Sequence, residues 1–208
     1  MEPPVDLLVV LAHPRSDSLV SALASAVLDA AQGVGARVAC HDLYGDGFDP
    51  RLTAAEVEAP VFSDQLSSRY ASELLTADAV VVVHPVWFFG PPAVLKGWVE
   101  RVVREGVAFD VGPDGSVTGR LRAREALVVT TGNAGQATEM ALGDPVTRFW
   151  KDVVFGPAAV RDTHRVAFAP VRGCSDEERA AWLQRVAREA EDVIARSRAY
   201  GVSHRDER

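Results

Sequence analysis

The pattern of apolar and polar positions changes its period twice near the start of the chain. Residues 5–12 form an almost unbroken run of β-branched and aliphatic side chains, which is typical of a strand buried on both faces of a parallel sheet. From residue 17 the apolar side chains recur at steps of three and four, which predicts a helix with one apolar stripe that ends at Gly33 and Gly35. A second strand is expected at 37–40.

Strands and helices continue to alternate after residue 40. Residues 41–60 are rich in turn-forming side chains and predict a long connection with one helical turn. The polar stretch 106–119 is expected to be a hairpin-like excursion, and Ser175 with Glu178 is a capping-box pattern that precedes the last helix. The other strands are expected at 79–83, 126–130 and 160–168, and the other helices at 63–76, 94–103, 145–155 and 183–194.

This alternation predicts one doubly wound α/β domain. Strands that alternate with helices form a parallel sheet, and right-handed crossovers leave few topologies. We expect the strand order 2-1-3-4-5 for the five strands, with a single domain over residues 1–200 and a solvated tail at 201–208. In such sheets ligands bind beyond the carboxyl ends of the strands, at the switch point between the first and third strands.

Composition disfavours several classes of partner. The chain has 22 Lys and Arg against 29 Asp and Glu, a net charge of −7, which disfavours binding to nucleic acid and to anionic lipid. Hydrophobic residues make up 48% and charged residues 25%, so the chain is expected to bury an ordinary globular core. The longest apolar run, 79–95, is interrupted by His, Pro and Gly, so no membrane insertion is expected.

Cysteine and motif content narrow the chemistry further. Cys40 and Cys174 are far apart and in no metal-type spacing, which favours a reduced, cytoplasmic protein. The first residues lack the basic region of a signal peptide. The histidines form no zinc motif, and the sequence has no Gly-x-Ser-x-Gly, Walker A or Gly-x-Gly-x-x-Gly pattern. A metal site, an acyl-transfer nucleophile and the common nucleotide-binding motifs are therefore disfavoured.

The loop after the first strand is a candidate anion site. It carries His13, Arg15, Ser16 and Ser18 just before the first helix. Free backbone N–H groups and the helix dipole favour an anion there, with hydroxyl and guanidinium donors nearby. The alternative is that Asp17 or Ser18 simply caps the helix, and the loop alone does not decide between the two.

The loop after the third strand is unusually aromatic, with the sequence His84-Pro85-Val86-Trp87-Phe88-Phe89-Gly90-Pro91-Pro92. Aromatic clusters more often belong to a core. Here proline and glycine on both sides keep the three rings out of a regular apolar stripe. Flat side chains and exposed backbone amides at a strand end suit a planar heteroaromatic ligand.

The loop after the fourth strand is Thr130-Thr131-Gly132-Asn133-Ala134-Gly135. It offers hydroxyls, an amide and small residues that let the backbone approach a ligand closely. By itself it is an ordinary turn. Because the carboxyl ends of parallel strands share one edge of a sheet, the three loops are expected to meet there.

Together the loops resemble those of the flavodoxin-like NAD(P)H:quinone oxidoreductases, the DT-diaphorase group and its bacterial relatives. The resemblance is carried by Leu11-Ala12-His13-Pro14 with Ser18, by residues 84–98, and by Thr130-Thr131-Gly132, with consistent spacing from residue 5 to about residue 155. The middle segment is long and unusual enough to make the match specific. It implies the flavodoxin-like fold and a flavin-dependent enzyme that reduces a quinone or similar planar acceptor in two-electron, ping-pong fashion.

The resemblance also implies the ligands. The cofactor is a flavin, FMN or FAD, with NADPH or NADH as electron donor, and the 41–63 connection lacks an adenine cradle, which favours FMN. The first loop would hold the flavin phosphate, the second would lie along the isoalloxazine edge and the third would contact the pyrimidine end. The residues expected to bind it are His13, Arg15, Ser16, Ser18, Leu19, Pro85, Val86, Trp87, Phe88, Phe89, Thr130, Thr131, Gly132 and Asn133.

A homodimer, with each pocket partly closed by the partner chain, is a further implication of the resemblance. The helix around Trp98 supports it, because its apolar residues exceed what one sheet face needs. Symmetric dimers are also the commonest assembly of soluble chains.

The sequence departs from the mammalian members of this group after the third loop. Those proteins carry a Tyr and a His thought to stabilise charge on the reduced flavin, whereas this chain has Gln136 and Leu142 at the corresponding positions. We therefore expect the backbone amides of Gly132, Asn133 and Ala134 to take that role. No side chain is expected to be catalytic, since the cofactor supplies the reaction.

Two other functions share this site. One is a flavin-binding regulatory or accessory subunit of a membrane transport system, which would bind flavin without rapid turnover. The other is a pure electron carrier. It is disfavoured because the aromatic loop and the 106–119 excursion indicate a roofed pocket for a second ligand.

Overall fold

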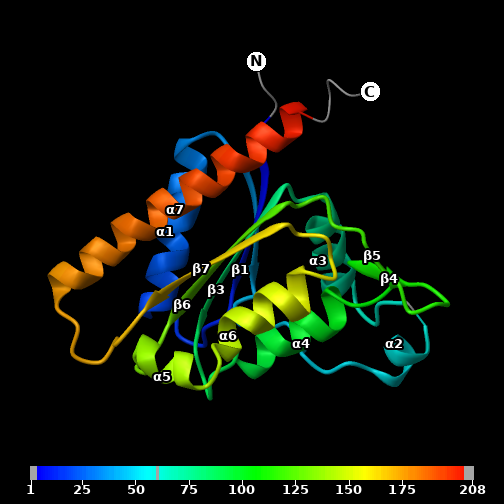
Figure 1. Cartoon of the computed structure of the whole chain (residues 1–208), viewed down its shortest axis with the longest axis horizontal. Helices are drawn as coiled ribbons and strands as arrows, with labels where there is room; N and C mark the ends of the chain where they lie inside the picture. The colour runs from blue at the N-terminus through cyan, green and yellow to red at the C-terminus, as the bar shows by residue number, and fades with distance from the viewer. Residues whose placement is uncertain (1–3, 60, 204–208) are drawn as a thin grey trace.

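The computed structural model describes residues 4–59 and 61–203, and its centre is a five-stranded parallel sheet (Figure 1). The strands lie in the order β2-β1-β3-β6-β7, and each neighbouring pair is parallel. This is the predicted order 2-1-3-4-5, so the doubly wound topology is confirmed. The strands are β1 (Asp6–Leu11), β2 (Arg37–Asp42), β3 (Ala79–Pro85), β6 (Glu125–Thr131) and β7 (Asp162–Phe168).

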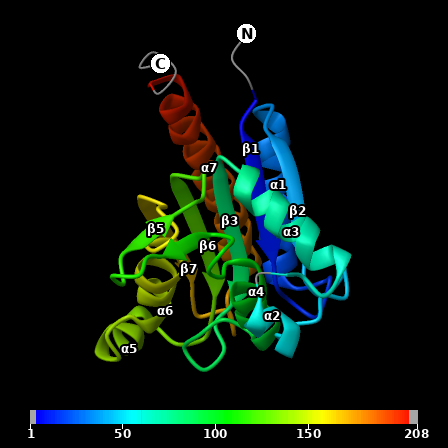
Figure 2. The same ribbon diagram turned by 90° about the vertical axis from the view of Figure 1, so that its right-hand side faces the viewer.

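Helices cover both faces of the sheet (Figure 2). α1 (Leu19–Gly33) and α7 (Asp176–Ser203) pack together on one face, and α3 (Gln65–Thr76) and α4 (Ala93–Val102) lie on the other. The two central strands β3 and β6 are buried at every residue, whereas the edge strands β2 and β7 have exposed positions. The valine-rich runs of the central strands are the sequence signature of this double burial.

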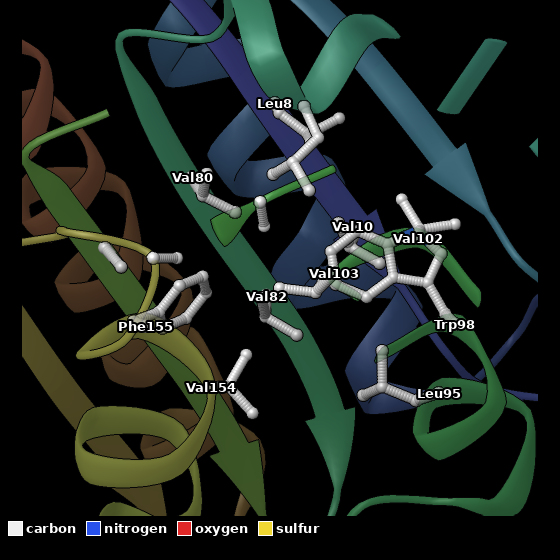
Figure 3. Close-up of a cluster of buried hydrophobic side chains, with 14 of the residues drawn as sticks. Leu8, Val10, Val80, Val82, Leu95, Trp98, Val102, Val103, Val154 and Phe155 are labelled. Carbon is white, nitrogen blue, oxygen red and sulfur yellow. The ribbon is translucent and has the colours of Figure 1, made fainter. Parts of the chain in front are cut away.

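Alternate side chains of each strand enter opposite cores. Val80 and Val82 of β3 belong to the cluster that contains Leu95 and Trp98 of α4 (Figure 3), while the intervening Val81 packs in the cluster formed with α1 and α7. This follows from the two-residue side-chain period of a strand. The sheet is therefore held rigidly between two cores, which fixes the positions of the loops at its ends.

The apolar residues of α4 are used within the chain itself. Trp98 is completely buried, and its ring centroid lies 6.2 Å from that of His41. The surplus of apolar residues on this helix, which supported the prediction of a homodimer, is therefore absorbed by the chain's own core. The interface of a dimer would therefore have to be formed by other surfaces than α4.

A buried ion-pair network fastens the connection between β2 and α3 onto α4. Arg101 donates to Glu56 at 2.6 Å, to Asp64 at 2.6 Å and to the Asp49 carbonyl at 2.6 Å. Burial alone would raise the pKa of Glu56, but its hydrogen bonds, chiefly from Arg101, lower the pKa to about 2. Because breaking such a buried pair leaves an uncompensated charge, the network keeps α4 in place behind the loop that precedes it.

The predicted irregular segments form as expected. The connection contains α2 (Ala54–Glu58), and the excursion is an antiparallel hairpin of β4 (Phe109–Val111) and β5 (Val117–Gly119). Gly119 packs against the backbone of Ala158, just before β7 begins, and a groove of about 460 Å³ separates the hairpin from α2. The base of the hairpin is thus anchored near the start of β7.

The segment between β6 and β7 is more elaborate than the sequence indicated. A short helix, α5 (Gln136–Ala141), comes first, and the predicted helix at 145–155 is α6 (Pro145–Arg148) followed by a π-helix, η1 (Phe149–Phe155). π-helical turns are rare in proteins, and those that occur are often found near functional sites. Here the π turn carries the fully buried Trp150.

The last helix begins as predicted. The Ser175 N–H donates to the Glu178 carboxylate at 2.7 Å, and the Glu178 N–H donates to the Ser175 hydroxyl at 3.1 Å, which is the predicted capping box. α7 continues to Ser203. The predicted tail at 201–208 lies outside the described residues from 204 onward.

Three findings concern the described part of the chain as a whole. None of its helices is long and apolar enough to cross a membrane. In the same residues, no group of three or more His, Cys, Asp or Glu is placed to hold a metal ion. Cys40 and Cys174 are both free thiols.

Candidate functional site

The three loops singled out from the sequence meet at the carboxyl edge of the sheet. The Val86 N–H donates to the Thr131 carbonyl at 2.7 Å and joins the second loop to the third. The rings of His13 and Trp87 lie 6.3 Å apart, centroid to centroid, and bring the first loop to the second. Parallel strands end at the same edge, so loops that are far apart in the sequence become neighbours.

The first loop contains the helix cap that one of the two sequence interpretations predicted. The Ser18 hydroxyl accepts from the Ser21 N–H at 3.1 Å and caps α1, as the capping alternative predicted. The N–H groups of Leu19 and Val20, in the first turn of α1, have no partner in the described part of the chain. These amides, at the positive end of the helix dipole, are the donors an anion would use. The cap fixes the helix terminus, and the amides beside it stay available.

Arg15 and His13 are held by short-range contacts within the same loop. Arg15 forms a two-point ion pair with Asp17, at 2.8 and 2.9 Å, and the side chains of both are mostly exposed. An exposed pair of this kind is weak because solvent screens it, so Arg15 is free to exchange Asp17 for a ligand phosphate. Nδ1 of His13 lies 3.1 Å from the Arg15 N–H and 3.2 Å from the Arg15 carbonyl, so the backbone of Arg15 holds the imidazole within the loop.

The aromatic loop contains a tight turn with an unusual backbone. The Trp87 N–H donates to the Gly90 carbonyl at 3.0 Å, and the Gly90 N–H donates back at 3.1 Å. The two residues between them, Phe88 and Phe89, have φ of 51° and 57°. Positive φ at both central positions is the type I′ pattern, which strongly favours Asn and Gly. Two phenylalanines here are strained, and such strain clusters at functional sites.

The strain presents aromatic faces to the outside. Phe88 is fully exposed and Trp87 is 42% exposed. Large aromatic side chains gain most of their free energy from burial, so Phe88 gains almost nothing inside this chain and Trp87 gains only part of what it could. A flat ligand that covers them would recover that free energy.

The third loop offers fewer backbone donors than expected. The Gly132 N–H donates to the Phe168 carbonyl at 3.1 Å, so this amide is already used by the neighbouring strand. The Asn133 side-chain oxygen accepts from the Arg172 N–H at 2.8 Å. Within the described residues the backbone N–H groups of Asn133 and Ala134 have no partner. The proposed stabilisation of charge therefore rests on these two amides.

Thr130 and Thr131 are buried beneath this loop, with exposed fractions of 1% and 6%. The Thr130 hydroxyl accepts from the Arg165 guanidinium at 3.0 Å. The Thr130 side chain is therefore engaged inside the protein. Contacts between the third loop and a ligand would have to come from other residues of that loop.

Sequence reasoning missed the cluster around Arg165. Its guanidinium donates to Glu139 at 2.7 and 3.1 Å and to Asp144 at 3.3 Å, which ties α5 and the start of α6 to β7. These residues, with Gln136 and Arg185, line a cavity of about 380 Å³ beside the third loop, away from the β1–β3 switch point. An arginine within an otherwise alternating strand was the signal that could have revealed it.

The donor sets of the three loops fit the parts of a flavin. Amides at the start of α1 and the exposed Arg15 suit a phosphate. The exposed Trp87 and Phe88 suit a flat ring system, and the amides of Asn133 and Ala134 suit the polar edge of that ring. Fold and loops together define a doubly wound α/β protein whose carboxyl edge is built for a planar ligand that carries a phosphate.

Comparison with known proteins agrees with this class. The sequence profile of the flavodoxin-like fold family matches residues 6–192. The chain is 29% identical over 209 aligned residues to ribosyldihydronicotinamide dehydrogenase (quinone) of Pongo abelii, covering 86% of this chain and 90% of that protein. It is 30% identical over 120 residues to the FMN-dependent NADH:quinone oxidoreductase of Thiobacillus denitrificans, covering 55% of each.

A solved structure shows the same fold. The NAD(P)H:quinone oxidoreductase of Methanothermobacter marburgensis superimposes with a TM-score of 0.79 at 20% identity, over 92% of this chain and 100% of that one. The protein belongs to the flavodoxin-like family of NAD(P)H:quinone oxidoreductases. It is an oxidoreductase enzyme of that family.

Proposed function

We propose that the protein binds FMN at the carboxyl edge of its sheet and uses NADH or NADPH to reduce a quinone or a similar planar acceptor by two electrons. The observation that carries the proposal is the strained aromatic turn, which exposes Trp87 and Phe88 beside the amides of Asn133 and Ala134. The relative from Thiobacillus denitrificans is named for FMN and NADH, which supports the same pair of ligands here.

Each loop has one task in this proposal. The amides at the start of α1, with Arg15 and the imidazole of His13, hold the phosphate. Trp87 and Phe88 cover the ring system, and Pro85 and Val86 shape its edge. When bound, the flavin supplies hydride acceptance from the nicotinamide and hydride donation to the acceptor.

The protein's own contribution is placement and electrostatics. The amides of Asn133 and Ala134 stabilise the negative charge that develops at the polar edge of the ring during transfer, because fixed dipoles need no reorganisation. The aromatic turn covers one face of the ring system, so only the opposite face is left to receive one flat molecule at a time. Donor and acceptor therefore use the same place in turn, which predicts ping-pong kinetics.

A homodimer is part of the proposal. Phe88, Met140, Leu142 and Val153 are all more than half exposed. They come from the aromatic turn and from the α5 to η1 segment that follows the third loop, and a second copy would cover such apolar surface. Light scattering at micromolar concentration tests this, and a monomer would count against it.

The cytoplasm remains the expected location. It rests on the composition and on the two cysteines, Cys40 and Cys174, which are free thiols.

The decisive experiment is to purify the protein and identify its flavin. We expect a yellow protein that releases FMN and that oxidises NADH or NADPH rapidly when a quinone is present, with parallel lines in double-reciprocal plots. A colourless protein that binds neither FMN nor FAD on titration would refute the proposal. A protein that binds flavin but turns over only very slowly would favour the regulatory subunit instead.

A second experiment tests the third loop. A Cβ added to Gly132 would lie 3.7 Å from Cβ of Val86, which is an ordinary contact distance, so the Cβ itself fits. The two γ-methyl groups of valine would then occupy the space where the edge of the flavin ring is expected. We expect Gly132→Val to lower flavin affinity or the rate of flavin reduction at least tenfold, about 1.4 kcal/mol. Gln136→Ala and Leu142→Ala should stay within about threefold of the wild type, under about 1 kcal/mol. A large loss at Gln136 with little at Gly132 would assign the role to that side chain.

A further inference from the structure

His84 lies directly behind the aromatic loop and takes no part in the proposed flavin contacts. It is the second-to-last residue of β3 and is completely buried. Its Nδ1 lies 2.8 Å from the Pro85 carbonyl, and its Nε2 lies 2.9 Å from Nε1 of Trp150. Both ring nitrogens are thus in contact with defined partners.

The partners fix the tautomer of the ring. An indole N–H can only donate, so Trp150 makes Nε2 of His84 the acceptor. The proton of the neutral ring must then be on Nδ1, from which it donates to the Pro85 carbonyl. Burial lowers the pKa of His84 to about 4. The positive charge of Arg165 lowers this pKa further, and the hydrogen bond to the Pro85 carbonyl raises it in part. The ring is therefore neutral at neutral pH.

Trp150 is itself rigidly held. It is fully buried in η1, with the rings of Phe149 and Phe155 at 5.2 and 5.6 Å. The indole direction is consequently set by the π-helix and its aromatic neighbours. A single chain of contacts leads from η1 through the imidazole to the last carbonyl of β3.

That carbonyl is the one from which the aromatic turn departs. Val86 follows Pro85 directly and donates to the third loop, and the strained turn begins at Trp87. β1 ends earlier than β3, since its last paired residue is Leu11 opposite Val83. The Pro85 carbonyl therefore lies beyond the last residue of β3 that pairs with β1. The Nδ1–H of His84 is the hydrogen-bond donor for this carbonyl.

We propose that His84 is a positioning residue for the flavin site: Trp150 holds it in the Nδ1–H tautomer, and that proton fixes the Pro85 carbonyl and with it the aromatic turn. The inference rests on the proposed function, because it concerns the geometry of that site. Its chemical basis is that a buried carbonyl with a fixed donor cannot rotate without losing a bond.

Three variants separate the tautomer from simple packing. His84→Asn keeps an N–H donor near the position of Nδ1, whereas His84→Gln places its amide near the position of Nε2. Trp150→Phe retains an aromatic ring and removes only the indole donor. We expect the dissociation constant for FMN to rise at least fivefold in His84→Gln and Trp150→Phe and less than threefold in His84→Asn.

His41→Asn is the matched control. His41 is also completely buried, and its Nε2 contacts Glu73 on α3 at 2.8 Å, so it lies outside the three loops. Its replacement should lower the melting temperature and leave FMN affinity unchanged. Equal losses of affinity in His84→Asn and His84→Gln would show that only packing matters and would overturn the inference.

Nitrogen NMR of the unliganded wild type reads the tautomer directly. A dominant Nδ1–H form of His84, which becomes mixed in Trp150→Phe, is the expected result. A dominant Nε2–H form in the wild type would overturn the inference. Because this measurement needs no flavin, it is separate from the titration of the wild type with FMN, whose failure would refute the proposed function.

Discussion

Phe88→Asn is expected to stabilise the unliganded protein. Phe88 has φ 51°, and left-handed backbone costs an ordinary L-residue about 1–2 kcal/mol, whereas Asn tolerates it well. Because the Phe88 side chain is fully exposed, its removal takes little packing from the chain. We expect the free energy of unfolding to rise by about 1 kcal/mol, or roughly 2–4 °C in melting temperature for a chain of this size.

The same replacement should weaken flavin binding. Covering half of a phenylalanine side chain is worth about 1 kcal/mol, and stacking of one ring on another adds about 1 kcal/mol. The sum of about 2 kcal/mol corresponds to a roughly 30-fold higher dissociation constant for FMN. Stability and binding are therefore predicted to change in opposite directions.

Thermal unfolding of the flavin-free protein and fluorescence titration with FMN measure the two effects. Ala159→Gly is the control, because Ala159 also has positive φ, 68°, but precedes β7 at the opposite end of the sheet. It should relieve strain and leave FMN affinity unchanged. A lower melting temperature for Phe88→Asn with unaltered FMN binding would refute the reasoning, since the ring would then be packing within the chain.

Two further predictions concern the scaffold. Gly97→Ala should destabilise the protein by about 1–3 kcal/mol in urea denaturation, because the new Cβ would lie 2.4 Å from Pro50. Gly33→Ala is the control: its new Cβ would have nothing within 4 Å, so it should stabilise the protein by up to about 1 kcal/mol. Equal effects of the two replacements would contradict the packing argument. Burial lowers the pKa of His41 and His84 from 6.5 to about 3 and about 4, so below pH 6.5 the unfolded chain binds protons that the folded chain does not. Stability should fall as the pH drops from 6.5 toward 4, by up to about 1.4 kcal/mol per pH unit for each histidine, and a flat profile from pH 7 to 5 would contradict this.

Local pattern was sufficient for the frame of the protein. The unbroken valine run of β3 has no polar position to place in water, so it had to be a central strand. Ser175 and Glu178 satisfy the first amides of α7 through contacts three residues apart, which is why that capping box was visible in the sequence. Once the strands were assigned, the short list of allowed crossovers led to the observed order and to the edge where the three loops meet.

Contacts between distant residues decided how the site is built. The Gly132 amide is used by Phe168, the Thr130 hydroxyl by Arg165 and His84 by Trp150, and none of these pairings follows from spacing. The sequence by itself determined the strands of the sheet, the principal helices and the three loops, because those depend on side-chain period and local caps, whereas α5 and the π-helix η1 were not visible in it. Only the tertiary structure decided which polar groups at the loops remain available to a ligand, because a donor is consumed or left open by partners that the chain brings together only when it folds.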